Sequence, residues 1–214
     1  MSFFDVHTHN KIVSENIFSI VNKYPTATHF TKPFSIGIHP WYLKLANVEK
    51  ELLFIEEKLQ DKNCFAIGEC GLDKVTEIDF ELQKIVFRKQ LQLSEKYKKP
   101  VIIHCVKAFQ EIIELKKELR PSQTWILHGF QKNLHIAESL LKNGIVMSFG
   151  AAIIHSKKLQ YIVSEIPLAS ILLETDASDM FIHDVYKKVA ALKNMEVEIL
   201  QQKIEKNFKS IFKK

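Results

Sequence analysis

Short apolar segments alternate along this chain with amphipathic helical patterns, and this alternation limits the folds that the chain can adopt. The apolar segments lie at residues 3–9, 34–41, 64–73, 101–105, 124–128, 145–150 and 171–176. Near-continuous apolar strands separated by helices are typical of a parallel sheet covered by helices. The sequence therefore predicts an α/β protein with seven confident strands.

The helical patterns fill most of the intervals between these strands. Helical spacing of apolar residues predicts helices at about 47–59, 82–97, 109–119, 136–142, 159–163, 183–193 and 196–212. A further short helix is predicted from Ser14 to Tyr24, because Ile17, Ile20 and Val21 follow helical spacing. The interval 25–32 is predicted to be a loop, with a short strand at 27–30 as an option.

Size, composition and charge are those of an ordinary globular protein. The 214 residues suffice for one core and predict a single domain, 1–214, while 46% hydrophobic and 26% charged residues argue against disorder. The net charge of +5 comes from lysines spread along the chain and weakly favours a polyanionic substrate. Three cysteines without a CxxC pair, no signal peptide and no membrane-spanning run predict a reduced, cytoplasmic protein.

Polar residues that could bind a metal ion or take part in catalysis lie where the predicted strands end. In a TIM-type (β/α) barrel the carboxyl ends of the strands form one rim, and catalytic groups come from several strand ends. No glycine-rich phosphate loop opens any predicted helix, so a barrel fits better than a doubly wound sheet. The residues at these strand ends are His7, His9, His39, Glu69, His104, His128 and Asp176.

Six of these residues are candidate metal ligands. Residues two apart in a strand point the same way, so His7 and His9 can bind one ion. Imidazole and carboxylate together suit zinc, manganese, cobalt or iron, and magnesium less well. A single histidine at a strand end is more often a hydrogen-bonded core residue, but joint placement on one rim favours metal. The six ligands are His7, His9, Glu69, His104, His128 and Asp176.

The ligand count admits one or two divalent ions, with Mg²⁺, Mn²⁺ or Zn²⁺ as candidates. One ion would lie among His7, His9, Glu69 and Asp176, and the other among Glu69, His104 and His128, with Glu69 as the bridge. Two metals ~3.5–4 Å apart can hold the attacking and leaving oxygens of a displacement. Asp176 is the candidate for orienting the attacking water and taking its proton, so Asp176 and Glu69 are the predicted catalytic residues.

These residues lie in motifs that resemble those of the TatD family of metal-dependent deoxyribonucleases, within the amidohydrolase superfamily. The resemblance covers nearly the whole chain. It implies a distorted TIM barrel, a divalent metal site built from the six ligands, and 3′–5′ exonuclease hydrolysis of DNA. The matching motifs are Asp5-Val6-His7-Thr8-His9, Gly37-Ile38-His39-Pro40, Gly68-Glu69-Cys70-Gly71-Leu72-Asp73, Ile103-His104, Leu127-His128 and Leu173-Glu174-Thr175-Asp176.

The chain departs from the family pattern on the substrate side. The interval between His9 and Gly37 is about half the usual length, so the second strand-helix unit is expected to be shortened or missing. Val106 stands where the family has an arginine, and Lys107 is the candidate for the phosphate contact, though without a bidentate fork. The stretches 129–132 and 177–179 also differ. Every ligand position is kept.

The substrate therefore stays open at this stage. His39 is a candidate contact for the scissile phosphate or a structural His-Pro turn, and Trp41 could stack on a base or simply pack. The leading prediction is a monomeric DNase acting on single strands or 3′ ends. The alternatives are a hydrolase of a small amide, ester or lactone, and a metal-binding interaction module without turnover.

Overall fold

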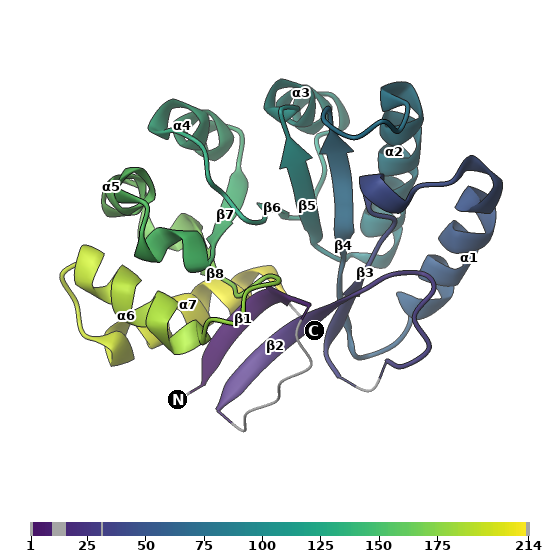
Figure 1. Ribbon diagram of the computed structural model, residues 1–214. Coiled ribbons are helices and arrows are strands. Elements are labelled where there is room, and N and C mark those ends of the chain that lie inside the picture. Colours follow the sequence, from purple (N-terminus) through teal and green to yellow (C-terminus); the bar gives the residue numbers. More distant parts are fainter. Residues whose placement is uncertain (1, 10–15, 31, 213–214) are drawn as a thin grey trace. The chain divides into compact units, whose positions relative to one another are not determined.

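A computed structural model describes residues 2–9, 16–30 and 32–212 (Figure 1). Eight strands follow one another in sheet order from β1 to β8, which is the strand order of a TIM-type (β/α) barrel. The strands are β1 Phe3–Thr8, β2 Ile17–Lys23, β3 Phe34–Ile36, β4 Cys64–Asp73, β5 Val101–Val106, β6 Trp125–Leu127, β7 Ile145–Phe149 and β8 Ile171–Leu173. The predicted α/β barrel class is confirmed.

Among the described residues, seven α-helices accompany the strands, each where helical spacing predicts one. They are α1 Val48–Lys58, α2 Phe80–Tyr97, α3 Phe109–Leu119, α4 Leu134–Lys142, α5 Lys157–Glu165, α6 Ile182–Leu192 and α7 Val197–Ile211. Within the described ranges, no helix is both long and apolar enough to cross a membrane. The chain divides into two compact units, Asn22–Leu127 and Met1–Val21 with His128–Lys214. The assignment of one domain to residues 1–214 stays a prediction.

The unit Asn22–Leu127 is built on strands β3 to β6. β4 pairs in parallel with β3 and with β5, and β5 pairs with β6, so that Gly71 lies opposite His104 and Ile103 opposite Leu127. All ten residues of β4 are buried, and helix α2 packs along this strand. A strand buried on both faces explains why β4 reads as a nearly continuous apolar run.

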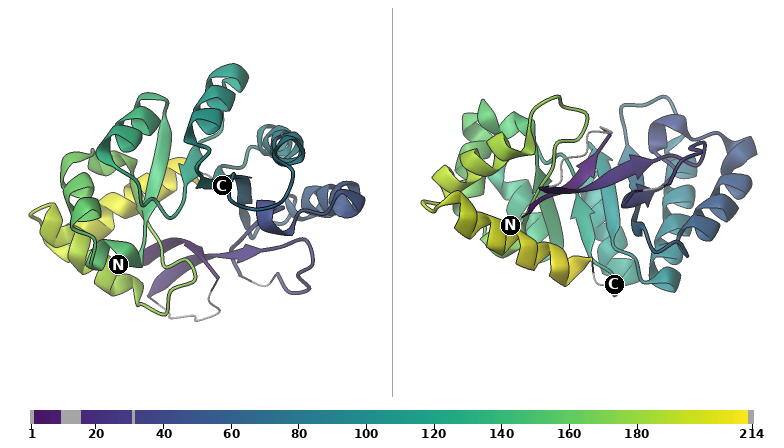
Figure 2. Two further views of the ribbon diagram at one scale, coloured as in Figure 1. Left: turned by 45° about the horizontal axis from the view of Figure 1, so that its top comes forward. Right: turned by 90° about the horizontal axis from the view of Figure 1, so that it is seen from below.

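The second unit contains β1, β7 and β8 and the two C-terminal helices. β7 pairs with β8, and Thr8 at the end of β1 forms a parallel bridge with Asp176. Helix α7 lies against β1 and β8 (Figure 2). Phe208 of α7 holds this contact, since its ring centroid is 4.6 Å from that of Phe4 and 5.2 Å from that of Phe18.

The structure corrects the prediction of seven strands. Residues 17–23 form strand β2, not the predicted helix, and pair in parallel with β1. Ile17, Ile20 and Val21 follow helical spacing, but the same segment is rich in β-branched and aromatic residues, which favour a strand. The strand of the second strand-helix repeat of the barrel is thus present as β2. The helix of that repeat is missing from the described residues between β2 and β3. The optional strand at 27–30 is wrong, and the predicted cap at Ser14 lies outside the described residues.

Candidate metal centre

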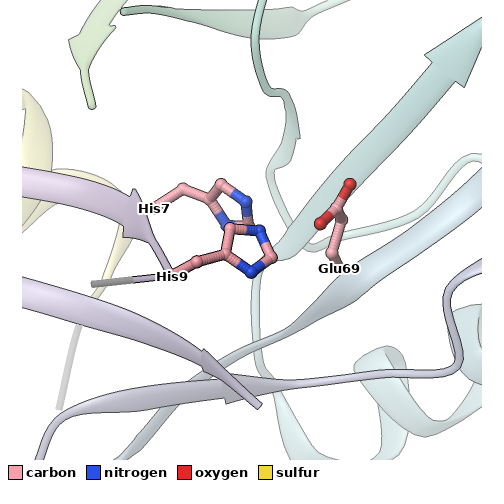
Figure 3. A group of neighbouring side chains, drawn as sticks. All are labelled: His7, His9 and Glu69. Carbon is pink, nitrogen blue, oxygen red and sulfur yellow. The ribbon is translucent and has the colours of Figure 1, made fainter. Parts of the chain in front are cut away.

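Glu69 is the centre of a buried cluster in the unit Asn22–Leu127. Its Oε1 lies 2.9 Å from Nδ1 of His104 and 3.0 Å from Nε2 of His39. The Glu69 side chain projects from β4 (Figure 3), and Glu69 and His39 are 4% and 3% exposed. Donor atoms of these three residues lie within 4.8 Å of one another. One carboxylate and two imidazoles are thus concentrated where water is largely excluded.

Two glycines let β4 approach β5 closely enough to place Glu69. Gly68 and Gly71 have φ angles of 134° and 147°, in a region that residues with a side chain rarely adopt. A Cβ at Gly68 would lie 2.4 Å from the carbonyl oxygen of Ile102, and one at Gly71 would lie 2.0 Å from that of His104. The backbone N–H of Glu69 donates to Oδ1 of Asn22 at 2.8 Å. These contacts therefore fix the backbone position from which the Glu69 side chain projects.

Two buried glutamines of helix α2 hold the backbone around this cluster. Gln90 accepts from the backbone N–H of Ile38 at 2.7 Å and donates to its carbonyl oxygen at 3.2 Å. Gln83 accepts from the N–H of Asp73 at 2.8 Å and donates to its carbonyl oxygen at 3.0 Å. Each amide thus replaces a missing backbone partner at a strand end, beside the residues that carry the chemistry.

Asp73 orients His104 from the side opposite Glu69. Oδ2 of Asp73 lies 3.1 Å from Nε2 of His104 and accepts from Nε1 of Trp41 at 2.6 Å. Burial alone would raise the pKa of Asp73, but hydrogen bonds from Trp41, the N–H of Val75 and His104 lower it overall. An ionised carboxylate behind an imidazole fixes the ring's orientation and tautomer, as second-layer partners of metal ligands do.

The hydrogen bonds of His39 give its ring a different chemical role. Its Nδ1 accepts from the backbone N–H of Trp41 at 3.1 Å, so in the neutral ring Nε2 carries the proton. Nε2 therefore donates toward Glu69 and is suited to donate to an anion. His39 thus caps the 3₁₀ turn Pro40–Tyr42, as the alternative of a structural His-Pro turn expects, and the phosphate contact stays a prediction.

The second unit gathers four of the predicted ligands, His7, His9, His128 and Asp176. Oδ1 of Asp176 lies 3.5 Å from Nε2 of His7 and 3.4 Å from Nε2 of His9. The imidazoles of His7 and His9 lie together at the end of β1 (Figure 3), with ring centroids 5.1 Å apart. The ring of His128 follows at 4.4 Å from His7. Donor atoms of His7, His128 and Asp176 lie within 4.8 Å of one another.

The backbone fixes Asp176 against the first strand. Its N–H donates to the carbonyl oxygen of His7, and its carbonyl oxygen accepts from the N–H of His9, both at 3.0 Å. Asp176 has a φ of 54°, a left-handed conformation that aspartate tolerates better than most residues. The two histidines and the carboxylate are therefore held by one short backbone bridge.

Buried carboxylates support this cluster from behind. Asp5 accepts hydrogen bonds from the backbone N–H and the hydroxyl of Thr175, at 3.0 and 2.7 Å. Burial raises the pKa of Asp5 to about 7, although the bonds from Thr175 act in the opposite direction. Glu174 accepts from the N–H of Gly129 at 2.6 Å and from the hydroxyl of Ser148. Glu174 and Thr175, which precede Asp176, are thereby joined to Gly129, which follows His128, and to Asp5 of β1.

The donor set fits a divalent metal ion. His7 is fully buried and His128 is largely buried. Burying two imidazoles beside a carboxylate is costly in an apolar core, but the same groups supply good nitrogen and oxygen ligands for a metal ion. The part of Asp176 that remains exposed, 42% of its side chain, leaves room for water. Imidazole with carboxylate favours zinc, manganese or iron over calcium.

The predicted site residues thus form two groups, each within one unit. His7, His9, His128 and Asp176 lie together, and Glu69 and His104 lie together with His39. The bridging role of Glu69 stays a prediction. Lys107 follows β5 as an exposed residue with a φ of 55°.

The residues that support the two clusters were not predicted. Asp5, Asp73 and Glu174 lie inside the quoted motifs but received no role. Each is a charged residue in or beside a buried strand and therefore needs a partner. That rule alone could have marked them.

Comparison with known proteins identifies the family. The model of the family described as TatD related DNase matches residues 3–213. An uncharacterized metal-dependent hydrolase of Buchnera aphidicola is 31% identical over 83% of this chain and 73% of its own length. The human 3′-5′ RNA nuclease TATDN2 is 34% identical over 67% of this chain and 20% of its own length. The crystal structure of YjjV, a TatD homologue from Escherichia coli, shares the fold with a TM-score of 0.83 at 23% identity, over 98% of this chain and 97% of that chain.

Proposed function

The chain belongs to the family of TatD-related DNases and is a metal-dependent hydrolase, and we propose that it hydrolyses phosphodiester bonds of DNA from the 3′ end. The observation that supports the proposal is the convergence of histidine and carboxylate donors within each unit: His39, Glu69 and His104 in one, and His7, His128 and Asp176 in the other. Single strands and free 3′ ends are the proposed substrates. The protein is proposed to be cytoplasmic and to act as a monomer, and light scattering of the purified protein tests the monomeric state.

The proposed ligands are His7, His9, Glu69, His104, His128 and Asp176. A divalent ion held there would lower the pKa of bound water and polarise the phosphoryl oxygen. Within this arrangement the chain's own groups divide the remaining work. Asp73 keeps His104 in one orientation through the 3.1 Å contact with Nε2, and the bridge to β1 keeps Asp176 beside His7 and His9.

Asp176 is the proposed proton acceptor. Its Oδ1 lies next to two imidazoles, and much of its side chain remains accessible to water. A carboxylate in this position can accept a hydrogen bond from the attacking water and take its proton. His39 donates through Nε2 to the phosphate oxygen in the proposed complex, and Lys107 adds a positive charge beyond the end of β5. Arginine would contact phosphate in two places, whereas lysine contacts it as a point charge.

A labelled oligonucleotide tests the proposal. Wild-type protein is incubated with 5′-labelled single-stranded DNA in Mn²⁺ or Mg²⁺, and in parallel with RNA of the same sequence. We expect a ladder of 3′-shortened DNA that is abolished by EDTA and reduced at least 100-fold in Asp176→Asn. Asp184→Asn is the matched control, because that side chain is similarly exposed at 49% but pairs with Lys187 on α6.

The outcomes separate the competing functions. Cleavage of RNA alone would contradict the proposal that DNA is the substrate, but it would still support a phosphodiesterase activity. Metal binding without cleavage of either polymer would contradict the nuclease proposal and leave an ester, lactone or amide hydrolase, or a metal-binding module, as the explanation. Cleavage that persists in EDTA would contradict metal dependence itself.

A further inference from the structure

A groove of about 410 Å³ opens beside His39 in the unit Asn22–Leu127. The start of the loop after β2 forms one wall, and the 3₁₀ turns Pro40–Tyr42 and Leu45–Asn47 with the first turn of α1 form the other. Its lining includes Tyr24, Trp41, Tyr42, Lys44, Asn47 and Glu51. Ligand pockets generally measure about 300–1,000 Å³, so the groove is suited to one small group.

Exposed aromatic rings dominate the lining. Trp41 and Tyr42 are 54% and 56% exposed, although large aromatic side chains are usually well buried. The ring of Tyr42 meets the ring of Tyr24 edge-on, with centroids 5.1 Å apart. The indole N–H of Trp41 is tied to Asp73, which fixes the plane of the ring. Fixed, accessible π-faces are the elements with which proteins stack unpaired bases.

Polar groups complete the groove at its α1 end. Asn47 precedes α1 without a side-chain hydrogen bond to the helix N-terminus, and Glu51 stands one turn later on the same face. Burial raises the pKa of Glu51, with Lys44 acting in the opposite direction. An amide and a carboxyl group offer donors and acceptors to the edge of a heterocycle, and Lys44 offers a cation to a phosphate.

We propose that this groove binds the nucleobase of the nucleotide next to the bond that is cleaved. The inference rests on the proposed function, because His39 belongs both to the groove lining and to the Glu69 cluster. A base stacked on Tyr42 and Trp41 would lie directly beside a phosphate held at His39. Aromatic faces with polar edges fit a flat heterocycle better than a lipid chain, and the groove volume selects a single unpaired base rather than a duplex.

Tryptophan fluorescence provides a direct test. The chain has two tryptophans, of which Trp125 is fully buried and Trp41 lines the groove. Full-length protein, as purified, is titrated with adenosine 5′-monophosphate and with ribose 5-phosphate, which lacks the base. We expect saturable quenching by the nucleotide and none by the sugar phosphate. Neither probe contains a phosphodiester, so binding is measured without turnover.

Variants assign the binding to the groove. We expect Tyr42→Ala to weaken the nucleotide Kd by about fivefold to 100-fold, as loss of one stacking ring does. Tyr42→Phe keeps the ring and should keep the Kd within about twofold, which separates stacking from misfolding. Tyr161→Ala is the matched control, because Tyr161 on α5 is 57% exposed and does not line the groove.

The result also separates the two proposals. Equal binding of both probes, or an unchanged Kd in Tyr42→Ala, would overturn the base-binding groove even if DNA is cleaved. Base-dependent binding that Tyr42→Ala abolishes would support the groove even if neither DNA nor RNA is hydrolysed, and the nuclease proposal would then fail alone. Quenching by an aromatic peptide as strong as that by the nucleotide would also overturn the proposal.

Discussion

The hydroxyl of Tyr186 is predicted to hold the first strand, and hence His7, in place. Tyr186 on α6 is fully buried, and its oxygen accepts from the backbone N–H of Phe4 at 3.0 Å while donating to the carbonyl oxygen of the same residue at 3.1 Å. Burial raises the pKa of Tyr186, so the hydroxyl stays protonated and can donate throughout the usual pH range. Tyr186→Phe removes one atom and both hydrogen bonds.

The expected cost follows from the two backbone groups that lose their partner. A buried donor or acceptor left unsatisfied costs about 1–3 kcal/mol. The ring itself is retained, so no large cavity adds to the cost. For two such groups, with partial relaxation of the strand, we expect the free energy of unfolding to fall by about 2–4 kcal/mol.

Urea denaturation followed by circular dichroism measures this difference. Tyr161→Phe is the control, since its ring is exposed and its change should stay within about 0.5 kcal/mol. The Mn²⁺ affinity of Tyr186→Phe should also fall, because β1 carries His7. A loss of stability below about 0.5 kcal/mol in Tyr186→Phe would show that this hydroxyl does not anchor β1.

Three further predictions concern other contacts of the unit Asn22–Leu127. Gln90→Leu should lower stability by about 2–4 kcal/mol in the same urea assay, because the backbone N–H and carbonyl of Ile38 both lose their buried partner. Glu95→Gln should lower the free energy of unfolding by about 1 kcal/mol at pH 7 and by less at pH 3. Hydrogen bonds from residues 122 and 123 hold the pKa of Glu95 below its usual value, although burial acts in the opposite direction. The stability that the ionised carboxylate contributes is therefore lost as the pH falls and Glu95 becomes protonated. Equal losses at the two pH values would contradict that assignment. Lys107→Ala should raise the KM for DNA severalfold and reduce the salt slope of binding by about one, whereas an unchanged slope would remove Lys107 from the phosphate contact.

The strand ends could be predicted because one physical rule places them. Buried parallel strands are apolar along their length, so a histidine or carboxylate at the end stands out against that background. Asp176 is recognisable for this reason. Glu69 stands out against the same apolar background, although β4 continues past it to Asp73. The structure brings each carboxylate to imidazoles in its own unit.

Contacts between distant segments could not be predicted in the same way. Ile17, Ile20 and Val21 satisfy both helical and strand patterns, and only pairing with β1 decides for the strand. The sequence does not show what the glutamines of α2 bind, because their backbone partners lie in other elements. The groove beside His39 likewise depends on two turns and a loop, whose shape no local periodicity encodes.

Metal content of the purified protein shows directly whether the histidine and carboxylate donors bind a metal ion. The protein is loaded with Mn²⁺, freed of excess ion by gel filtration and measured by inductively coupled plasma mass spectrometry, together with Asp176→Asn, Glu69→Gln and the control Asp184→Asn. We expect at least one tightly held ion in the wild type and in the control, and a marked loss in the two site variants. Equal metal content in all four proteins, or none in the wild type, would contradict the metal centre.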